Sequence, residues 1–281
     1  MATYVRPATL VHALECRAAG AEVLAGGTDS WPVRVGKPAY ATPGATILDL
    51  SAVHELRAIE TVDNALRIGG LATWTSLAEA GLPPAFAALQ MAAREIGGRQ
   101  IQNRGTIGGN LCNASPAADG VPPLLILDAS VELSSVNGMR TVLLAEFLTG
   151  PRRTLLGPDE LLTAIVIPMP AANAQSNFIK LGARKYQLIS IVMGAAMLSM
   201  KAGRVAEAAI AVGSCSPVAC RLAALERDLI GVRGAELASV VSPQHLSALT
   251  PIDDIRADVA YRNDAAFVVV RRLLSAIAGH A

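Results

Sequence analysis

Residues 103–129 read NRGTIGGNLCNASPAADGVPPLLILDA and are the most informative stretch of this 281-residue chain. From Gly97 to Pro123 the chain shows little hydrophobic periodicity, although the segments on either side have clear helix and strand patterns. A connection of that length inside a compact protein is usually functional or disordered. Its embedded Ile, Leu and Val residues argue against disorder. We therefore predict that this stretch is a long functional loop.

Two glycine-bearing loops point to a phosphate site. Leu24–Ser30 reads LAGGTDS, and Thr106–Asn110 reads TIGGN. Glycines let the backbone approach a ligand closely, so that successive N–H groups converge on a phosphate and a nearby hydroxyl adds a further donor. Gly-Gly-Thr-Asp is also an ordinary turn, so the first loop alone is weak support. Two such loops suit a diphosphate better than one, and Asp119 can accept hydrogen bonds from a ribose or ribityl hydroxyl.

Several other functions are excluded by pattern. The chain has no G-x-G-x-x-G followed by an acidic residue about 20 positions later and no G-x4-G-K-[ST], which argues against a Rossmann site and a P-loop. Lys and Arg number 24 against 23 Asp and Glu, so the net charge of +1 gives no field that would attract nucleic acid or an anionic membrane. We expect neither as a partner.

The location predicted from the sequence is the cytoplasm. The amino terminus lacks the pattern of a signal peptide, and the longest apolar run, Ile189–Met200, is shorter than the roughly 20 residues that cross a bilayer. Four cysteines are too few and too scattered for a disulfide framework. Cys215 and Cys220 have the spacing that opens one iron–sulfur motif, but position 223 is Ala, so we predict no cluster and no other metal site in this chain.

Hydrophobic periodicity predicts an α+β protein in two parts. Proline and small residues at Met169–Ser176 indicate a linker, with a smaller α+β domain after it. Helices are expected at Val11–Ala19, Thr75–Ala80 with a Thr cap, Pro84–Ile96, Arg221–Ile230 and Asp264–Ala278. Strands are expected at Glu22–Ala25, Thr46–Leu50, Ala65–Ile68, Val131–Ser135, Leu161–Ile167, Asn177–Leu181, Ile189–Met200 and Val205–Val212.

The chain resembles the FAD-binding subunits of the molybdenum hydroxylases, which include carbon monoxide dehydrogenase medium subunits and the flavin domain of xanthine dehydrogenase. The segments that carry the resemblance are AGGTD at 25–29, the stretch at 103–129, LGPDELLTAIVIP at 156–168, FIKLGAR at 178–184 and AVGSCSPVACR at 211–221. It implies the α+β FAD-binding fold of the vanillyl-alcohol oxidase and MurB type, also called the PCMH type. That domain would span 1–170, with subdomains at about 1–55 and 56–170, and a domain of the carbon monoxide dehydrogenase flavoprotein type would span 175–281.

The resemblance also implies the cofactor contacts. Ala25–Asp29 and Thr106–Asn110 would line the diphosphate, and Asp119 would hold a sugar hydroxyl. Leu156 would lie against the isoalloxazine ring, and Lys180 would lie near the ring's polar edge. The full set implied is Leu24, Ala25, Gly26, Gly27, Thr28, Asp29, Ser30, Thr106, Ile107, Gly108, Gly109, Asn110, Asp119, Leu156 and Lys180. No side chain of this chain is expected to act as a catalytic acid or base. Related chains often carry an acidic residue before Ile189, whereas Gln187 and Leu188 stand there in this sequence.

The implied function is electron transfer through FAD. A large partner would hold a molybdenum cofactor and a small partner would hold [2Fe–2S] clusters, in a dimer of heterotrimers, and the chain would pass electrons to NAD+, oxygen or another acceptor. A free-standing flavin reductase of the MurB type is one alternative, although no proton donor for a substrate can be named in the sequence. A non-enzymatic scaffold subunit that binds FAD weakly is the other.

Overall fold

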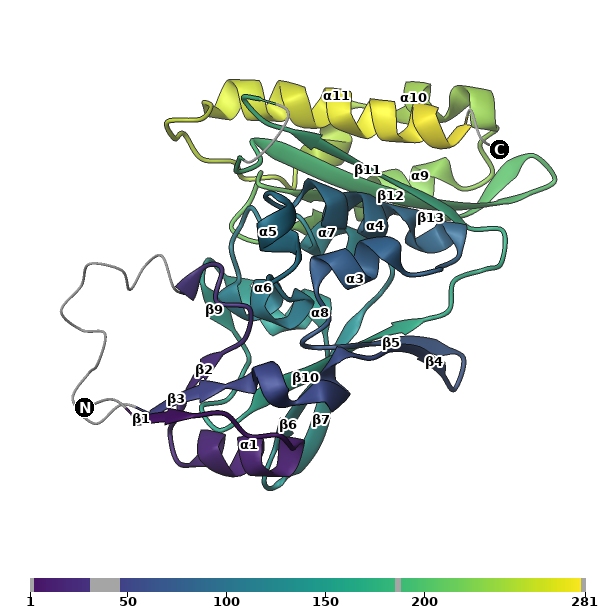
Figure 1. The fold of residues 1–281 in the computed structure, drawn as a ribbon. Helices are drawn as coiled ribbons and strands as arrows, with labels where there is room; N and C mark the ends of the chain where they lie inside the picture. The colour runs from purple at the N-terminus through teal and green to yellow at the C-terminus, as the bar shows by residue number, and fades with distance from the viewer. Residues whose placement is uncertain (1–2, 31–45, 185–187, 279–281) are drawn as a thin grey trace.

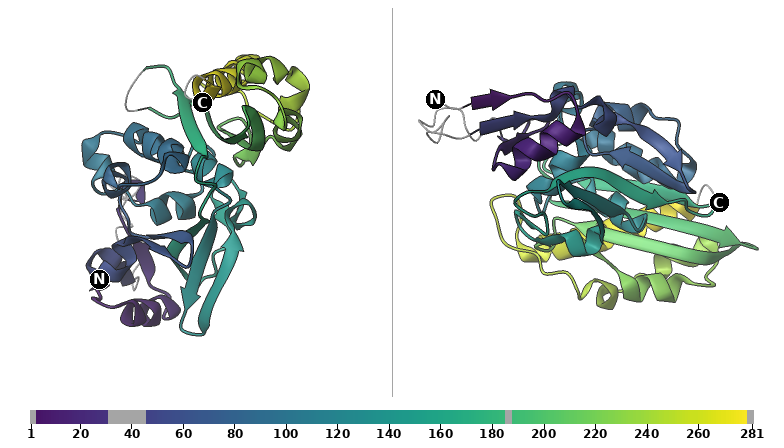
Figure 2. Two further views of the ribbon diagram at one scale, coloured as in Figure 1. Left: turned by 90° about the vertical axis from the view of Figure 1, so that its right-hand side faces the viewer. Right: turned by 90° about the horizontal axis from the view of Figure 1, so that it is seen from below.

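The computed structural model of the chain describes residues 3–30, 46–184 and 188–278. It is a mixture of helices and strands, as expected of an α+β protein. Figures 1 and 2 show a small parallel sheet with its helix at one end of the molecule and a sheet covered by a long helix at the other. Across the described residues, no helix has both the length and the apolar character needed to cross a bilayer.

The first unit is a three-stranded parallel sheet in the order β1-β3-β2. Its elements are β1 (Thr3–Val5), α1 (Leu10–Ala18), β2 (Glu22–Leu24) and β3 (Thr46–Asp49). Thr9 begins α1 by accepting a hydrogen bond from the N–H of His12, the expected behaviour of a Thr cap. Because β2 ends at Leu24, the predicted loop Leu24–Ser30 leaves from the carboxyl edge of this sheet, beside Asp49 of β3.

The second unit is an antiparallel sheet in the order β4-β5-β10-β6-β7. Its strands are β4 (Ile59–Val62), β5 (Ala65–Gly69), β6 (Ser130–Ser135), β7 (Gly138–Leu143) and β10 (Leu161–Pro168). Between β7 and β10 lie α8 (Leu144–Phe147) and a hairpin of β8 (Leu148–Gly150) and β9 (Arg153–Thr154). The strands predicted from the sequence at 65–68, 131–135 and 161–167 are confirmed.

Helices fill the space between this sheet and the next. They are α3 (Trp74–Glu79), α4 (Ala87–Glu95), α5 (Arg99–Gln102), α6 (Ile107–Asn113) and α7 (Val121–Ile126). The prediction of a continuous loop from Gly97 to Pro123 is wrong, because three short helices lie within or begin in it. Each is too short for its hydrophobic period to show in the sequence, and α6 depends on a local cap, in which the Thr106 side chain accepts from the N–H of Gly109. The cap of α3 is Thr73.

The last unit is a four-stranded antiparallel sheet in the order β11-β12-β13-β14. Its elements are β11 (Gln175–Leu181), β12 (Val192–Lys201), β13 (Arg204–Gly213), β14 (Cys220–Arg221), α9 (Ala223–Leu229), α10 (Leu237–Val240) and α11 (Val259–Ala278). Short 3₁₀ helices along the chain lie at Leu50–Ala52, His54–Arg57, Pro84–Phe86, Gly234–Glu236 and Pro243–Leu246. Helix α11 covers one face of the sheet, and α4 and α7 cover the other (Figure 1).

Strand β12 is buried on both faces, which explains its unbroken apolar sequence. Met193 and Ala195 pack with the helices below the sheet, whereas Ala196 and Leu198 pack with α11. The strand begins at Val192 and not at Ile189 as predicted. Residues 189–191 instead lead into the sheet, and the Ser190 hydroxyl in this lead-in binds the carboxylate of Asp119.

The largest hydrophobic core crosses the boundary predicted near residue 170. It includes Ile165 and Ile167 of β10 together with Phe178 of β11, Met193 of β12 and Ala211 of β13. A second cluster lies under α11, and a third lies between α1 and the parallel sheet. The division into domains at 1–170 and 175–281 is therefore kept as a proposal about the chain's organisation.

Candidate functional site

The two glycine loops lie against each other, although nearly 80 residues separate them in the sequence. A Cβ atom added at Gly26 would lie 2.2 Å from the carbonyl oxygen of Arg104, and one at Gly105 would lie 3.5 Å from Oγ1 of Thr28. A side chain at position 26 would therefore push the loops apart. The close approach of the two backbones explains why glycine stands there.

The backbone donors of the two loops differ in their availability. Within the described residues, the N–H groups of Gly26, Gly27 and Thr28 have no hydrogen-bond acceptor in the protein. By contrast, the N–H groups at the start of α6 donate to protein oxygens: Ile107 to Ala72, Gly108 to Gly70, Gly109 to Thr106 Oγ1 and Asn110 to Thr106. The first loop thus offers the free donors. The N–H groups of the second loop are already used in hydrogen bonds that fix it within the protein.

Asn110, in the first turn of α6, supplies an unsatisfied polar atom. Its side-chain oxygen Oδ1 is buried and has no hydrogen-bond partner in the part of the chain that the structure describes. The atom faces Gly120, where an added Cβ would lie 3.2 Å from it. A buried acceptor left unpaired costs roughly 1–3 kcal/mol, so this oxygen is expected to accept from a ligand donor or an ordered water.

Asp119 and Lys180 form a buried ion pair. The Lys180 Nζ atom lies 2.6 Å from Oδ2 of Asp119 and 3.3 Å from the carbonyl oxygen of Glu95, and each charged side chain is only 9% exposed. The Ser190 hydroxyl donates to Oδ1 of Asp119 at 2.5 Å. Burial raises the pKa of Asp119, and the ammonium of Lys180 and the hydroxyl of Ser190 oppose that rise. The charge of Lys180 is therefore largely compensated by its neighbour.

Leu156 lies on the turn after β9, and its half-buried side chain packs against the main core. An ion pair fixes this turn: Arg140 Nε donates to Oε1 of Glu160 at 2.6 Å, and Arg140 Nη2 donates to the carbonyl of Leu155 at 2.8 Å. Oε2 of Glu160 in turn accepts from the N–H of Gly157 at 2.7 Å. The hydrogen bond from Arg140 is the largest influence on Glu160 and lowers its pKa.

Some contacts at the site carried no signal in the sequence. Ser190 lies in the apolar run that predicts a strand, whereas the structure places it before β12, where its hydroxyl binds Asp119. The amide of Asn113, at the end of α6, donates to Asp29 at 3.1 Å and so links the two glycine loops. Gln187, which departs from the usual pattern, lies outside the described residues.

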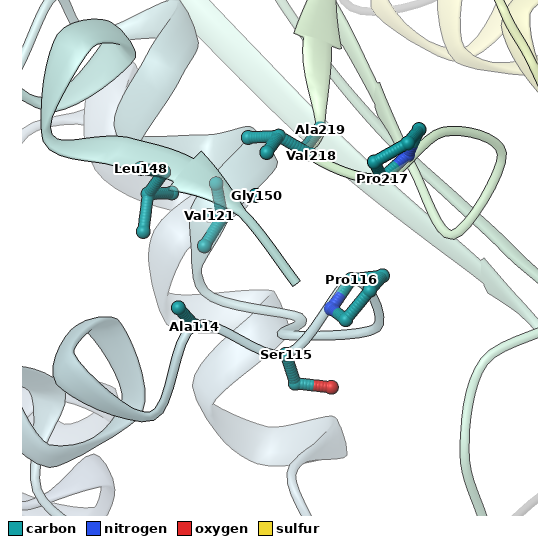
Figure 3. Close-up of a pocket in the computed structure, with 9 residues that line it drawn as sticks. All are labelled: Ala114, Ser115, Pro116, Val121, Leu148, Gly150, Pro217, Val218 and Ala219. Atoms are coloured by element: carbon teal, nitrogen blue, oxygen red, sulfur yellow. The ribbon is translucent and has the colours of Figure 1, made fainter. Parts of the chain in front are cut away.

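The hollow drawn in Figure 3 is not a substrate pocket. It lies between the segment that carries Ser115 and Pro116 and the segment that carries Pro217 and Ala219. Its volume of about 10 Å³ leaves room for about one water molecule. A larger cavity of about 450 Å³ lies far from the glycine loops, among Asn173, Met200, Gly203 and Ile277.

Comparison with known protein families identifies the chain. Residues 1–170 match the family described as the FAD binding domain in molybdopterin dehydrogenase. The chain belongs to this family. Residues 177–277 match the C-terminal domain of the carbon monoxide dehydrogenase flavoprotein. The predicted family, the α+β fold and the class of protein, an oxidoreductase subunit, are therefore confirmed.

Curated relatives of this family are FAD subunits. The nicotinate dehydrogenase FAD-subunit of Eubacterium barkeri is 40% identical over 152 residues, which are 53% of this chain and 51% of that protein. The xanthine dehydrogenase FAD-binding subunit of Escherichia coli O157:H7 is 34% identical over 93% of this chain and 87% of its own length.

A solved structure has the same fold over nearly the whole chain. It is carbon monoxide dehydrogenase from Hydrogenophaga pseudoflava lacking the Mo-pyranopterin moiety of the molybdenum cofactor. The TM-score is 0.87 at 27% identity, covering 98% of this chain and 96% of that one.

The residues of this flavoprotein fit FAD. Free N–H donors at Gly26–Thr28 suit a diphosphate, and the unpartnered Asn110 Oδ1 suits a hydroxyl or amide donor of the cofactor. The close packing of Gly26 against Arg104 fixes the position of the loop that carries these donors. The assignment of individual contacts to the predicted residues stays a prediction.

Proposed function

We propose that this chain binds FAD between the Leu24–Ser30 loop and the 106–119 segment and passes electrons from a [2Fe–2S] partner subunit to an external acceptor such as NAD+ or oxygen. The observation that carries the proposal is the set of free N–H groups at Gly26–Thr28, in a loop that packs against residues 104 and 105 just before α6. The unpartnered oxygen of Asn110 lies within α6. Family membership supports the identity of the ligand.

Each part of the site has a separate task in this proposal. The first glycine loop binds the diphosphate through its N–H groups, and α6 holds that loop in place. Asp119 accepts from a sugar hydroxyl with the lone pairs that Lys180 and Ser190 leave free, because an ionised carboxylate has about four acceptor sites. Leu156 presents an apolar surface to the ring, and Lys180 lies near its polar edge. FAD, when bound, supplies the redox chemistry.

The proposed assembly contains a large subunit with a molybdenum cofactor and a small subunit with [2Fe–2S] clusters, as a dimer of heterotrimers in the cytoplasm. Two observations support partners of this kind. The relatives reported above are named as subunits, and the similar carbon monoxide dehydrogenase carries a molybdenum cofactor in its intact form. The charge balance of this chain offers no attraction for nucleic acid.

Affinity purification of the chain from its native cells tests the proposal. We expect FAD, molybdenum and iron in the eluate with two further chains, and loss of the visible flavin absorption when the substrate of the large subunit is added anaerobically. Addition of NAD+ or oxygen should then restore it for the true acceptor. If the complex contains FAD that no substrate and no reduced partner can bleach, the proposed electron transfer is wrong.

The same purification separates the two rivals. A free-standing reductase would elute alone and yellow and would oxidise a nicotinamide donor by itself. A scaffold subunit would elute with its partners but without FAD. A Gly26→Ala variant with Gly81→Ala as its control sharpens the result, because a Cβ at Gly81 meets no atom within 4 Å. Only the first should lose FAD.

A further inference from the structure

Helix α11 carries one buried charge near its beginning, the guanidinium of Arg262. The residue is 3% exposed. Its Nη1 atom donates to the carbonyl oxygen of Ile191 at 2.6 Å and to that of Ser214 at 2.9 Å. Its Nη2 atom donates to Oδ1 of Asp254 at 2.8 Å. Burying an arginine is costly unless its donors are satisfied. Among the described residues Nη1 and Nη2 have acceptors, whereas the buried Nε atom has none. The three hydrogen bonds of Nη1 and Nη2 therefore define the position of the guanidinium.

The first carbonyl that Arg262 binds belongs to the segment that holds Asp119. Ile191 directly follows Ser190, whose hydroxyl donates to the Asp119 carboxylate at 2.5 Å. The N–H of Ile191 donates to the carbonyl of Leu181 at 2.8 Å, and Leu181 directly follows Lys180. Segment 190–191 is thus fixed on one side by β11 and on the other by Arg262.

The second carbonyl belongs to a segment that holds the same turn from its other end. The N–H of Ser214 donates to the carbonyl of Pro116 at 3.1 Å. Pro116 lies three residues before Asp119, within a turn closed by the hydrogen bond from Ala118 N–H to the Ser115 carbonyl at 3.0 Å. Figure 3 shows Ser115 and Pro116 on a segment that faces the one carrying Pro217.

We propose that Arg262 is a positioning residue of the flavin site. One guanidinium nitrogen holds together the backbone of residues 191 and 214, and these two segments hold the Asp119 turn at Ser190 and at Pro116. The side-chain hydrogen bonds of Arg262 go to Ile191, Ser214 and Asp254 and not to Asp119. Arg262 acts through hydrogen bonds that fix where the carboxylate lies. The inference rests on the proposed function, because it assigns Arg262 to the FAD contact expected at Asp119.

Asp254 orients the guanidinium. Besides the bond to Arg262, its carboxylate accepts from the N–H of Arg256 at 2.8 Å and from Arg256 Nη1 at 2.9 Å. Asp254 is therefore itself fixed in the loop before α11. An Asp254→Asn change keeps the shape of this contact and removes the charge, so it loosens Arg262 without removing it.

The experiment measures FAD affinity and thermal stability of the complex for Arg262→Gln, Arg262→Lys and Val270→Ala. Val270 is fully buried on the same helix and lies outside the hydrogen-bonded path. We expect Arg262→Gln to weaken FAD binding about 10-fold. Arg262→Lys should stay within about 3-fold of wild type, because an ammonium near the Nη1 position donates to both carbonyls. Val270→Ala should lower the melting temperature and leave the Kd for FAD unchanged.

Other results overturn the inference. Equal loss of FAD affinity in Arg262→Gln and Val270→Ala would show a general loss of stability, and an unchanged Kd in Arg262→Gln would show that the path does not reach the site. If Arg262→Gln does not fold, Asp254→Asn is the second variant, and its affinity for FAD should fall about 3-fold. An unchanged Kd for FAD in this variant would likewise show that the path does not reach the site. A wild-type complex that binds no FAD overturns the proposed function itself. That result is distinguishable from the outcomes above, because each of them compares a variant with a wild-type complex that binds FAD.

Discussion

The buried pair of Asp119 and Lys180 makes a prediction that can be worked out from its geometry. At 2.6 Å the two charges attract each other by about 6 kcal/mol for an effective dielectric constant of about 20. Desolvation costs several kcal/mol for each ion, so the intact pair adds little net stability. Removing one partner is different, because the other charge stays buried without compensation. That loss is about 3–5 kcal/mol for a buried pair.

Asp119→Asn should therefore lower the free energy of unfolding by about 3 kcal/mol, since the buried Lys180 ammonium loses the carboxylate with which it pairs. Lys180→Met should cost less, because the Asp119 carboxyl can take up a proton. Its pKa is raised in the folded state, so the stability of that variant should be retained at low pH and should fall as the pH rises through the folded-state value.

A double-mutant cycle measured by urea unfolding at 25 °C isolates the pair. The double variant, with Asp119→Asn and Lys180→Met together, should be more stable than the sum of the single changes predicts, by about 2 kcal/mol. Changes at unconnected positions add to within about 0.5 kcal/mol. If the effects of Asp119→Asn and Lys180→Met also add to within about 0.5 kcal/mol, the two side chains do not form one electrostatic unit.

Three further outcomes are expected. Gly26→Ala should give folded protein whose FAD affinity falls at least about 10-fold, because its Cβ would lie 2.2 Å from the Arg104 carbonyl; near-UV circular dichroism and a flavin titration check this. For Asp254, burial alone would raise the pKa, but hydrogen bonds from Arg256 and Arg262 outweigh it and lower the pKa to about 2. Its stabilising contribution should therefore be present above the unfolded-state pKa and be lost as the pH falls toward 2. Asp254→Asn should lower the free energy of unfolding by about 1 kcal/mol at neutral pH and weaken the dependence of that free energy on pH in the acid range. Burial raises the pKa of Cys215 to about 12, so iodoacetamide should label this thiol at a rate that follows unfolding, and rapid labelling of native protein at pH 8 would contradict it.

The parts of the fold that the sequence predicted are those with strong hydrophobic periods. The strand at 161–167 was predicted from a short, almost continuous apolar run, which the structure buries. The helix predicted at 264–278 follows from apolar residues at helical spacing, and the observed helix begins earlier, at Val259. The helices at Arg99–Gln102 and Ile107–Asn113 were missed because each spans two turns or fewer and is stabilised by a cap or by neighbouring segments. Tertiary contacts, not local propensity, decide such elements.

Only part of the site could be predicted from the sequence. Glycine pairs and an acidic residue indicated the loops, because glycine is the residue that permits two backbone segments to approach closely. Nothing in the sequence showed that Lys180 would neutralise Asp119, or that Ser190 would complete the cluster, because both depend on how β11 and the lead-in to β12 pack against the turn at 115–119. The partners of a buried charge are set by tertiary structure.

The polar cluster therefore binds the two parts of the chain into one functional unit. Asp119 comes from the segment that matches the FAD binding domain, whereas Lys180 and Ser190 come from the region beyond it. Without that region Asp119 would lose both side-chain partners, and Ile165 and Ile167 of β10 would lose the apolar neighbours supplied by Phe178 and the strands after it. We therefore propose that the C-terminal part forms one wall of the flavin site and is not an appended module, since the carboxylate expected to bind the cofactor is fixed from that side.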